Sequence, residues 1–151
     1  MNIVLLCVGS LKERFWEDAT KEYQKRLQKF CKLEIKELSE QNKFSGIDKI
    51  IAEEGKEIIA NIKGYSILFD IEGKEQSSEQ FAKNISSLFQ KSSTLTFIIG
   101  GSYGVSEEVK KRVDERLSFG KITLPHNLAR VVALEQIYRA FMINGGGKYH
   151  K

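Results

Sequence analysis

The stretch Leu-Thr-Phe-Ile-Ile-Gly-Gly-Ser-Tyr-Gly, residues 95–104, decides the fold class of this chain. Its first half is apolar enough to form a buried strand, and this strand runs directly into a glycine-rich loop. Further along, residues 121–124 predict a second strand that leads through Pro125 into a long apolar helix. In open α/β sheets, ligands bind in crevices beyond the carboxyl ends of the strands. We therefore expect a ligand site where these two loops meet.

The rest of the chain alternates between strand and helix patterns. Strands are predicted at 3–8, 33–38, 65–71, 95–99 and 121–124, and helices at 11–30, 47–62, 77–91, 105–117 and 128–143. Ser77 and Gln80 have the spacing of a capping box at the start of one helix. The alternation predicts an α/β fold with a five-stranded, mostly parallel sheet and helices on both faces. Without a linker or repeat, residues 1–151 are expected to form one domain.

Composition and charge restrict the function classes. The chain is 41% hydrophobic and 29% charged, and no apolar run approaches the roughly 20 residues of a membrane span. Two cysteines without an export signal indicate a reducing compartment, so we expect a cytoplasmic protein. The formal excess of +4 lies entirely within residues 119–151. This asymmetry favours an anionic partner such as RNA, although it is also within the range of a local fluctuation.

Familiar nucleotide and metal motifs do not match. The loop Gly100-Gly101-x-x-Gly104 lacks the spacing of a dinucleotide fingerprint, and Gly147-Lys148 lacks the other residues of a P-loop. With two histidines and no acidic cluster, a catalytic metal site is not expected. Taken alone, the glycine loop is a weak signal, since such loops often only let a strand turn into a helix.

The last helix is apolar on most of its sides, and a helix of this kind must be covered on most sides. We therefore expect a homodimer in which residues 128–143 pack against a second copy of the chain. Glu135 and Arg139 have the spacing of an ion pair, so Arg139 has a structural alternative to a role in substrate binding. Arg130 has no acidic neighbour at helical spacing, which favours an anionic ligand for it.

Three C-terminal motifs follow one another in a specific order. They are Phe97-Ile-Ile-Gly-Gly-Ser-x-Gly, then Thr123-Leu-Pro-His-x-x-x-Arg-Val, then Glu135-Gln-x-Tyr-Arg-Ala-Phe with a terminal Tyr149-His150-Lys151. This pattern, together with the opening Ile-Val-Leu-Leu-Cys-Val-Gly and the central Asp70-Ile-Glu-Gly-Lys, resembles the bacterial ribosomal RNA large-subunit methyltransferase H family. This family is the small, single-domain branch of the SPOUT, or α/β-knot, methyltransferases. The resemblance covers the whole chain.

The resemblance implies an S-adenosylmethionine-dependent enzyme that methylates N3 of a pseudouridine in 23S rRNA on assembled ribosomes. It also implies a deep trefoil knot in the C-terminal segment, with the cofactor bound in the knot. Carried over motif by motif, the cofactor contacts fall on Phe69, Gly100, Phe119, Gly120, Lys121, Ile122, Thr123 and Leu124. A glycine permits close approach of the backbone to a ligand, and backbone groups can bind an adenine edge without charged side chains.

The reaction needs a group that removes the N3 proton of the base as the methyl group arrives. His150 is the first candidate, because the pKa of an unperturbed histidine, about 6.5, is near the working pH. Tyr149 offers a stacking face, and Arg130 or Arg139 offers a cation for the developing anion or a phosphate. For His126, a role in shaping the loop is favoured over catalysis.

Two positions depart from the family pattern. Lys148 stands where proline is usual and follows three glycines, so the tail is expected to be mobile without RNA. Tyr103 stands where a small polar or acidic residue is expected. Two rival functions remain: a ribosome-binding factor that has lost the cofactor, and a SPOUT enzyme that acts on tRNA. The intact 119–125 segment argues against the first, and the lack of an added RNA-binding extension argues against the second.

Overall fold

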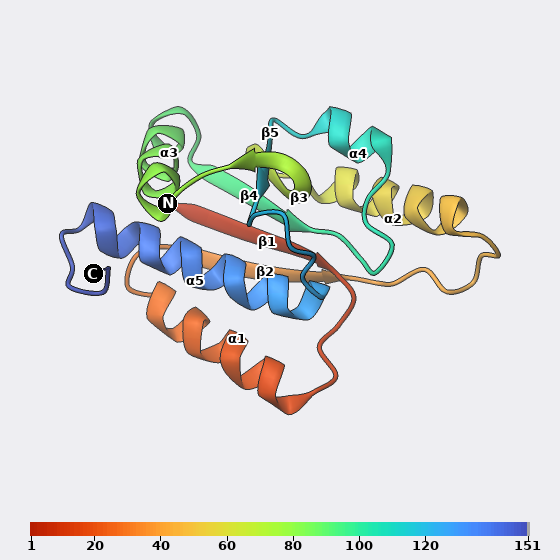
Figure 1. Ribbon diagram of the computed structural model, residues 1–151, viewed down its shortest axis with the longest axis horizontal. Coiled ribbons are helices and arrows are strands. Elements are labelled where there is room, and N and C mark those ends of the chain that lie inside the picture. The colour runs from red at the N-terminus through yellow and green to blue at the C-terminus, as the bar shows by residue number, and fades with distance from the viewer. Residues whose placement is uncertain (151) are drawn as a thin grey trace.

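A five-stranded parallel sheet forms the centre of the molecule (Figure 1). The computed structural model describes residues 1–150, so Lys151 lies outside the described part. The strands are β1 (Asn2–Val8), β2 (Lys32–Leu38), β3 (Tyr65–Glu75), β4 (Thr94–Ile99) and β5 (Glu115–Ser118), in the order β2-β1-β4-β3-β5. Each adjacent pair is parallel. The expected α/β class and five-stranded sheet are confirmed.

Helices cover both faces of the sheet because its central strands are apolar on both sides. Along β1, Ile3, Leu5 and Cys7 face one core cluster, and the alternate residues Val4 and Leu6 face the other. The first face is covered by α1 (Arg14–Leu27), α3 (Ser78–Lys91) and α5 (His126–Asn144). The second is covered by α2 (Ile47–Asn61) and α4 (Glu107–Arg112). The expected capping box of Ser77 and Gln80 is present at the start of α3.

The fifth strand lies earlier in the chain than residues 121–124, so that prediction was wrong, as was the long helix at 105–117. The structure ends α4 at Arg112 and forms β5 from Glu115–Ser118. Asp114 explains the difference. Its carboxylate accepts hydrogen bonds from Ser66 N at 2.8 Å and Ser66 Oγ at 2.7 Å, and its own N–H donates to Ser66 O at 3.1 Å. These bonds hold the chain against β3, where it joins the sheet instead of continuing as a helix.

The strand β3 extends to Glu75, beyond the predicted end at residue 71. Its pairing with β5 shifts register between Phe69 and Lys74, which is the mark of a bulge. Within the bulge, a Cβ atom at Gly73 would stand 2.6 Å from the carbonyl carbon of Leu117. Glycine is therefore required there for the two strands to approach, and the bulge displaces residues 70–73 beside the carboxyl ends of the other strands.

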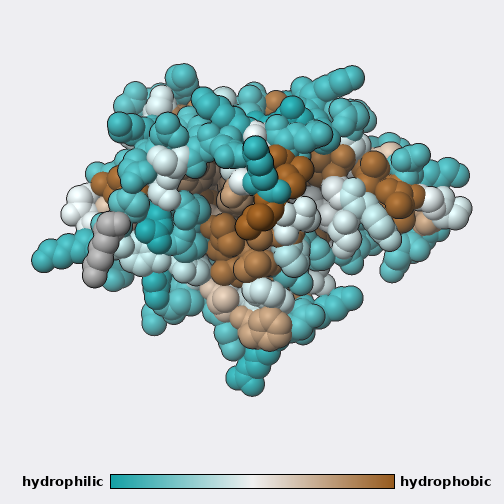
Figure 2. Space-filling model, in the orientation of Figure 1, coloured by the Kyte–Doolittle hydropathy of each residue, from teal (hydrophilic) through white to brown (hydrophobic). Residues whose placement is uncertain are grey.

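The helix α5 is covered mainly within its own protomer. Its residues Ala133, Leu134, Ile137 and Ala140 are buried in the core shared with the sheet, α1 and α3. The apolar circumference that suggested a dimer is thus largely explained without a second copy. An outward strip that includes Leu128 and Val132 stays partly exposed. Figure 2 shows apolar surface gathered in the middle of this face, over α5 and the segment that enters it. The dimer remains a prediction.

In residues 1–150, no helix is both long and apolar enough to cross a bilayer. Cys7 is 1% exposed within β1, as expected of a small core residue, and its burial raises the pKa of its thiol to about 12.

Candidate active site

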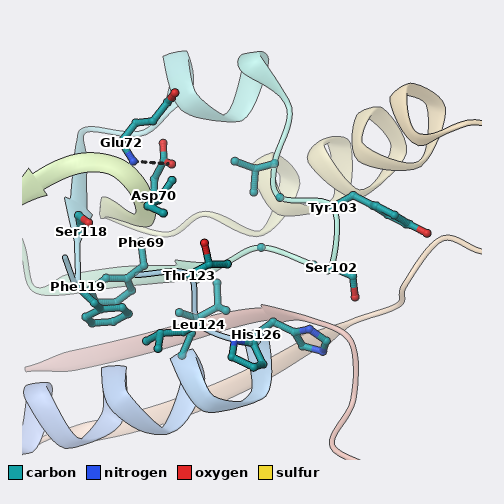
Figure 3. Close-up of a pocket in the computed structure, with 18 of the residues that line it drawn as sticks. Phe69, Asp70, Glu72, Ser102, Tyr103, Ser118, Phe119, Thr123, Leu124 and His126 are labelled. Atoms are coloured by element: carbon teal, nitrogen blue, oxygen red, sulfur yellow. Dashed lines mark hydrogen bonds between the residues drawn. The ribbon is translucent and has the colours of Figure 1, made fainter. Parts of the chain in front are cut away.

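A cavity of about 760 Å³ opens at the carboxyl ends of β3, β4 and β5 (Figure 3). Its walls come from the ends of these strands, the glycine-rich loop after β4 and the segment that leads into α5. Every expected cofactor contact lines the cavity except Lys121. The cofactor contacts implied by the resemblance therefore fall at one cavity, although the strand predicted at residues 121–124 is absent. The lining also includes Asp70, Glu72, Tyr103, Lys110, Pro125 and His126.

The segment from residue 119 to residue 124 leaves its backbone available to a ligand. Ser118 Oγ accepts from Gly120 N at 3.1 Å and donates to Gly120 O at 2.9 Å, and Gly120 adopts a positive φ of 114°. This turn directs the following residues across the cavity toward Pro125. Within the described chain, the backbone groups of residues 121–124 make no hydrogen bond to other protein atoms. A ligand edge with donors and acceptors can therefore pair with them.

The glycine loop after β4 forms the opposite wall. Gly104 N donates to Gly101 O at 3.1 Å, which closes a tight turn, and Gly104 has a positive φ of 80°. A Cβ atom at Gly100 would stand 2.8 Å from Val105 Cγ1 and 3.2 Å from Gly104 O. The absence of a side chain at Gly100 therefore lets the loop fold back beside the cavity.

We predict that Gly100→Ala weakens ligand binding in this cavity by at least about tenfold, because each 1.4 kcal/mol of loop strain costs a factor of ten. The added Cβ atom has no room unless Val105 and the turn behind it move. Isothermal titration calorimetry with S-adenosylmethionine measures the effect. Gly46→Ala is a control for general destabilisation, because it strains the backbone at a φ of 104° outside the cavity lining and should leave the affinity unchanged. Unchanged affinity in Gly100→Ala would mean that the loop does not shape the site.

An aromatic stack forms one side of the cavity. Phe69 and Phe119 lie with ring centroids 4.3 Å apart and an interplanar angle of 17°, and Phe69 also stacks against Phe97. Figure 3 shows Phe69 and Phe119 side by side next to Ser118. A third ring does not fit between them, so a bound aromatic group packs against an outer face of the stack. Behind it, a second cavity of about 280 Å³ reaches Val132 and Gln136 on α5.

The charged side chains at the rim of the cavity are paired with one another. Arg116 Nη1 lies 3.2 Å from Asp70 Oδ2, and Lys110 Nζ lies 3.3 Å from Glu72 Oε2. Sequence analysis did not assign these residues to the site, although the position of Asp70 at the end of a predicted strand was a usable signal. His126 Nε2 lies 3.9 Å from Glu40 Oε1, which is consistent with the expected loop-shaping role.

The candidate catalytic residues of the tail gather at the other end of α5. Arg139 Nε donates to Glu135 Oε1 at 3.0 Å, and the Tyr149 hydroxyl donates to the same oxygen at 3.1 Å. The Arg139 guanidinium carbon lies 4.8 Å from the centre of the Tyr149 ring. His150 contacts Arg139 Nη1 at 3.3 Å and Glu79 Oε1 at 2.7 Å. The ion-pair alternative for Arg139 is therefore realised, and the tail is placed on α5 and α3.

Within one protomer, these residues do not meet the cavity. The cavity includes His126 at the start of α5, whereas Tyr149 packs beside Arg139. Arg139 is ten positions along α5 from Ala129, the last α5 residue that lines the first cavity, which corresponds to about 15 Å at 1.5 Å per residue. The second cavity lies between them and reaches Ser78 and Gln136. Figure 1 shows the C-terminus at the end of α5 opposite the segment that enters the helix. The structure thus brings the cofactor candidates together and the tail candidates together, at two separate places.

Arg130 is buried, with 1% of its surface exposed. Its Nη1 donates to Glu37 Oε1 at 2.5 Å and its Nη2 donates to Gly9 O at 2.8 Å, while its Nε has no partner among the described residues. The sequence analysis was right that no acid lies at helical spacing from Arg130. Its acidic partner is Glu37, which comes from β2. A residue 93 positions away gives no local sequence signal, so Glu37 was missed. In this protomer the guanidinium is already engaged by protein atoms.

Comparison with known proteins agrees with the fold. A family model described as "Predicted SPOUT methyltransferase" matches residues 1–150. The ribosomal RNA large subunit methyltransferase H of Lactobacillus acidophilus is 50% identical, and that of Lactobacillus helveticus is 48% identical, each with 100% of both chains covered. Among solved structures, the Legionella pneumophila protein Lpg2936, determined in complex with SAM, is similar with a TM-score of 0.53 and 15% identity. That alignment covers 93% of this chain and 66% of the Legionella chain.

The likeness to the Legionella structure concerns the fold, whereas the full-length identity to the ribosomal RNA large subunit methyltransferase H proteins establishes a common family. The chain therefore belongs to the SPOUT methyltransferase family and, within it, to the ribosomal RNA large subunit methyltransferase H group.

Proposed function

We propose that this protein transfers the methyl group of S-adenosylmethionine to large-subunit ribosomal RNA, at N3 of a pseudouridine in 23S rRNA on the assembled ribosome. One observation carries the proposal: a cavity built from Gly100 and the unpaired backbone of residues 121–124, in a chain of this family. The names of the relatives support the ribosomal RNA substrate. The pseudouridine and the assembled ribosome follow from the family resemblance alone.

The cavity fits the cofactor by its chemistry. The unpaired backbone groups of residues 121–124 suit the donor and acceptor edge of adenine, and Phe69 and Phe119 offer an apolar flat face. Arg116 beside Asp70, and Lys110 between Glu72 and Glu107, reduce the repulsion of the cofactor carboxylate by these rim acids. When bound, S-adenosylmethionine supplies an electrophilic methyl group on a sulfonium. The deep trefoil knot around this site stays an expectation from the family.

The proton on N3 of the base has to leave as the new bond forms, so a nearby acceptor accelerates the reaction. His150 is the proposed acceptor. In this protomer its Nδ1 accepts from Arg139 and its Nε2 donates to Glu79, so His150 has to leave Arg139 before Nδ1 can take the N3 proton. Tyr149 does not serve as the base, because burial raises the pKa of its phenol to about 12 and the hydroxyl stays protonated. Tyr149 instead supplies an aromatic ring against which a nucleobase of the RNA can stack. Arg139 is proposed to stabilise the developing anion.

The placement of the tail away from the cavity of its own protomer supports a role for a second protomer. A tail that rests on its own α5 and α3 can face the cavity of a twofold-related copy. The outward strip of α5 with Leu128 and Val132 is the proposed contact surface. We therefore propose a homodimer in which each tail completes the site of its partner.

We predict that Leu128→Asp converts the protein to a folded monomer, because Leu128 is partly exposed on α5 and lies outside both cavities and both core clusters, so the charge enters only the proposed contact. Sedimentation velocity at micromolar concentration measures the mass, and circular dichroism checks the fold. Ser87→Asp, on the exposed side of α3, is the matched control and should stay dimeric. Phe141 is unsuitable for this test since it is 7% exposed and stacks on Phe30 inside the protomer. A monomeric wild-type protein would contradict the dimer.

The proposed function is tested with labelled S-adenosylmethionine and three substrates: assembled ribosomes, a short isolated hairpin of the target, and bulk tRNA. Ribosomes should be methylated far better than the hairpin, because specific nucleic-acid interfaces usually need about 1,000 Å² of contact and a shaped target supplies it. Added salt should weaken ribosome binding. Mass spectrometry of the nucleosides should identify the methylated base. Methylation of tRNA instead, or no binding of the cofactor, would favour one of the two rival functions.

A further inference from the structure

A buried carboxylate lies directly behind the glycine loop of the cavity. Glu54, on α2, is 5% exposed, and its Oε1 accepts a hydrogen bond from Gln41 N at 3.0 Å. Its other oxygen, Oε2, is buried and has no partner among the described residues. A Cβ atom at Gly101 would stand 3.0 Å from this oxygen and 3.0 Å from Val8 Cγ1. The unpaired oxygen therefore points at Gly101, whose opposite side lines the cavity.

Glu54 differs in this respect from the other acids near the site. Asp70 is paired with Arg116, and Glu72 shares Lys110 with Glu107, so each of these rim acids has a cation beside it. Within residues 1–150, Glu54 has no cation within salt-bridge distance, and its nearest charged neighbours, Glu40 and Glu57, are acids. Burial is the main cause that raises the pKa of Glu54. A buried anion of this kind is costly unless a positive charge compensates it.

We propose that Glu54 provides a negative charge behind the glycine loop that favours S-adenosylmethionine, whose sulfur is cationic, over the neutral thioether product S-adenosylhomocysteine. The proposal rests on the proposed function for the identity of the cofactor. The two molecules share the adenosine, amino and carboxylate groups, and they differ in the methyl group and the charge on sulfur. A charge that discriminates between them would therefore help the product to leave after methyl transfer.

The effect acts through space and needs no contact with the ligand. Because a Cα–Cβ bond is about 1.5 Å long, Glu54 Oε2 lies within about 5 Å of the Gly101 Cα atom. A ligand atom that touches the cavity side of Gly101 is then within about 9 Å of the carboxylate, and at such distances charges interact appreciably when little water lies between them. The intervening groups are Gly101 and the apolar side chain of Val8, which screen the charge only weakly.

The test compares two ligands in matched variants by isothermal titration calorimetry. Wild-type protein should bind S-adenosylmethionine more tightly than S-adenosylhomocysteine. Glu54→Gln, which keeps the shape and removes the charge, should reduce the ratio of the two dissociation constants at least fivefold. Glu57→Gln makes the same change of charge one turn along α2, where Glu57 only accepts a bond from Gln41 Nε2 at 3.3 Å, and should leave the ratio unchanged. Glu54→Asp retains the charge and should keep the wild-type preference even if both ligands bind more weakly.

If Glu54 has only a structural role, Glu54→Gln weakens the binding of both ligands equally and leaves the ratio of their dissociation constants unchanged. This result would overturn the proposal. Equal affinity of the wild-type protein for the two ligands would overturn it as well. If Glu54→Gln does not fold, Glu54→Met removes the charge without leaving an unpaired amide, and the same ratio is measured. If the wild-type protein binds neither ligand, the proposed function itself fails, which is distinct from a bound cofactor without preference.

Discussion

Deleting residues 148–151 should lower methyl transfer to ribosomes by about 10²–10⁴-fold, the usual contribution of a positioned acid–base group. The deletion removes Tyr149 and His150, together with Lys148 and with Lys151, which lies outside the described residues. Affinity for S-adenosylmethionine should stay within a factor of about two, because none of residues 148–150 lines the cavity of its own protomer. Single-turnover methylation and calorimetry measure the two quantities separately. His150→Ala should lower turnover more than it lowers ribosome binding.

Mixed dimers reveal which cavity the tail serves. If each tail completes the partner's site, a tail-deleted protomer keeps a usable cavity that the tail of a Gly100→Ala protomer can complete. Unfolding and refolding an equimolar mixture of the two variants should then restore activity to about a quarter of wild type, since half of the dimers are mixed and each has one complete site. The separate variants are the controls. If no activity returns while mixed dimers form, the tail does not act on the partner. If the deletion variant retains the wild-type rate, the tail has no role in catalysis.

Arg130→Ala should destabilise the protein by about 3 kcal/mol, the lower end of the cost of breaking a buried ion pair. The lower end applies because Arg130 is 1% exposed but the side chain of its partner Glu37 is 40% exposed, so water recovers part of the loss for Glu37. The Gly9 carbonyl also loses its donor. For a chain of this length, the midpoint of thermal unfolding should fall by about 10 °C, which differential scanning calorimetry measures.

Two further variants separate this stabilising role from a role in binding an anionic ligand. Arg130→Met fills most of the same space without a charge and should be less destabilising than Arg130→Ala. Glu37→Gln leaves Arg130 in place and should lower the midpoint less. If Arg130 contacts substrate, Arg130→Met loses methyl transfer even at temperatures at which it is fully folded. If Arg130 has only a structural role, the activity of Arg130→Met at 20 °C stays close to that of wild type.

Local patterns in the sequence were sufficient for much of the fold. Continuous apolar runs such as Leu95–Ile99 require burial on both faces, which a parallel sheet between helices provides, and the capping box of Ser77 and Gln80 appeared where its spacing predicted. A cavity lies where the sequence predicts a ligand site, because Gly100 and the segment that contains Phe119 follow strands whose carboxyl ends share one edge of the sheet. These features depend on neighbours along the chain, and periodicity reports them directly.

The remaining features depend on partners that are distant in sequence. The fifth strand is Glu115–Ser118 because Asp114 binds Ser66, and no pattern within residues 105–124 reveals that contact. The same holds for Arg130 with Glu37, and for Glu54 behind Gly101. The position of the tail is another such feature, since three glycines leave the direction of Tyr149 and His150 undetermined until α3 and α5 offer Glu79 and Glu135. The sequence by itself determined the α/β class, four of the five strands and the sheet edge at which the cavity lies. Only the tertiary structure decided which charges are paired, which are buried alone, and how far the tail lies from the cavity, because these depend on distances in space that residue spacing does not encode.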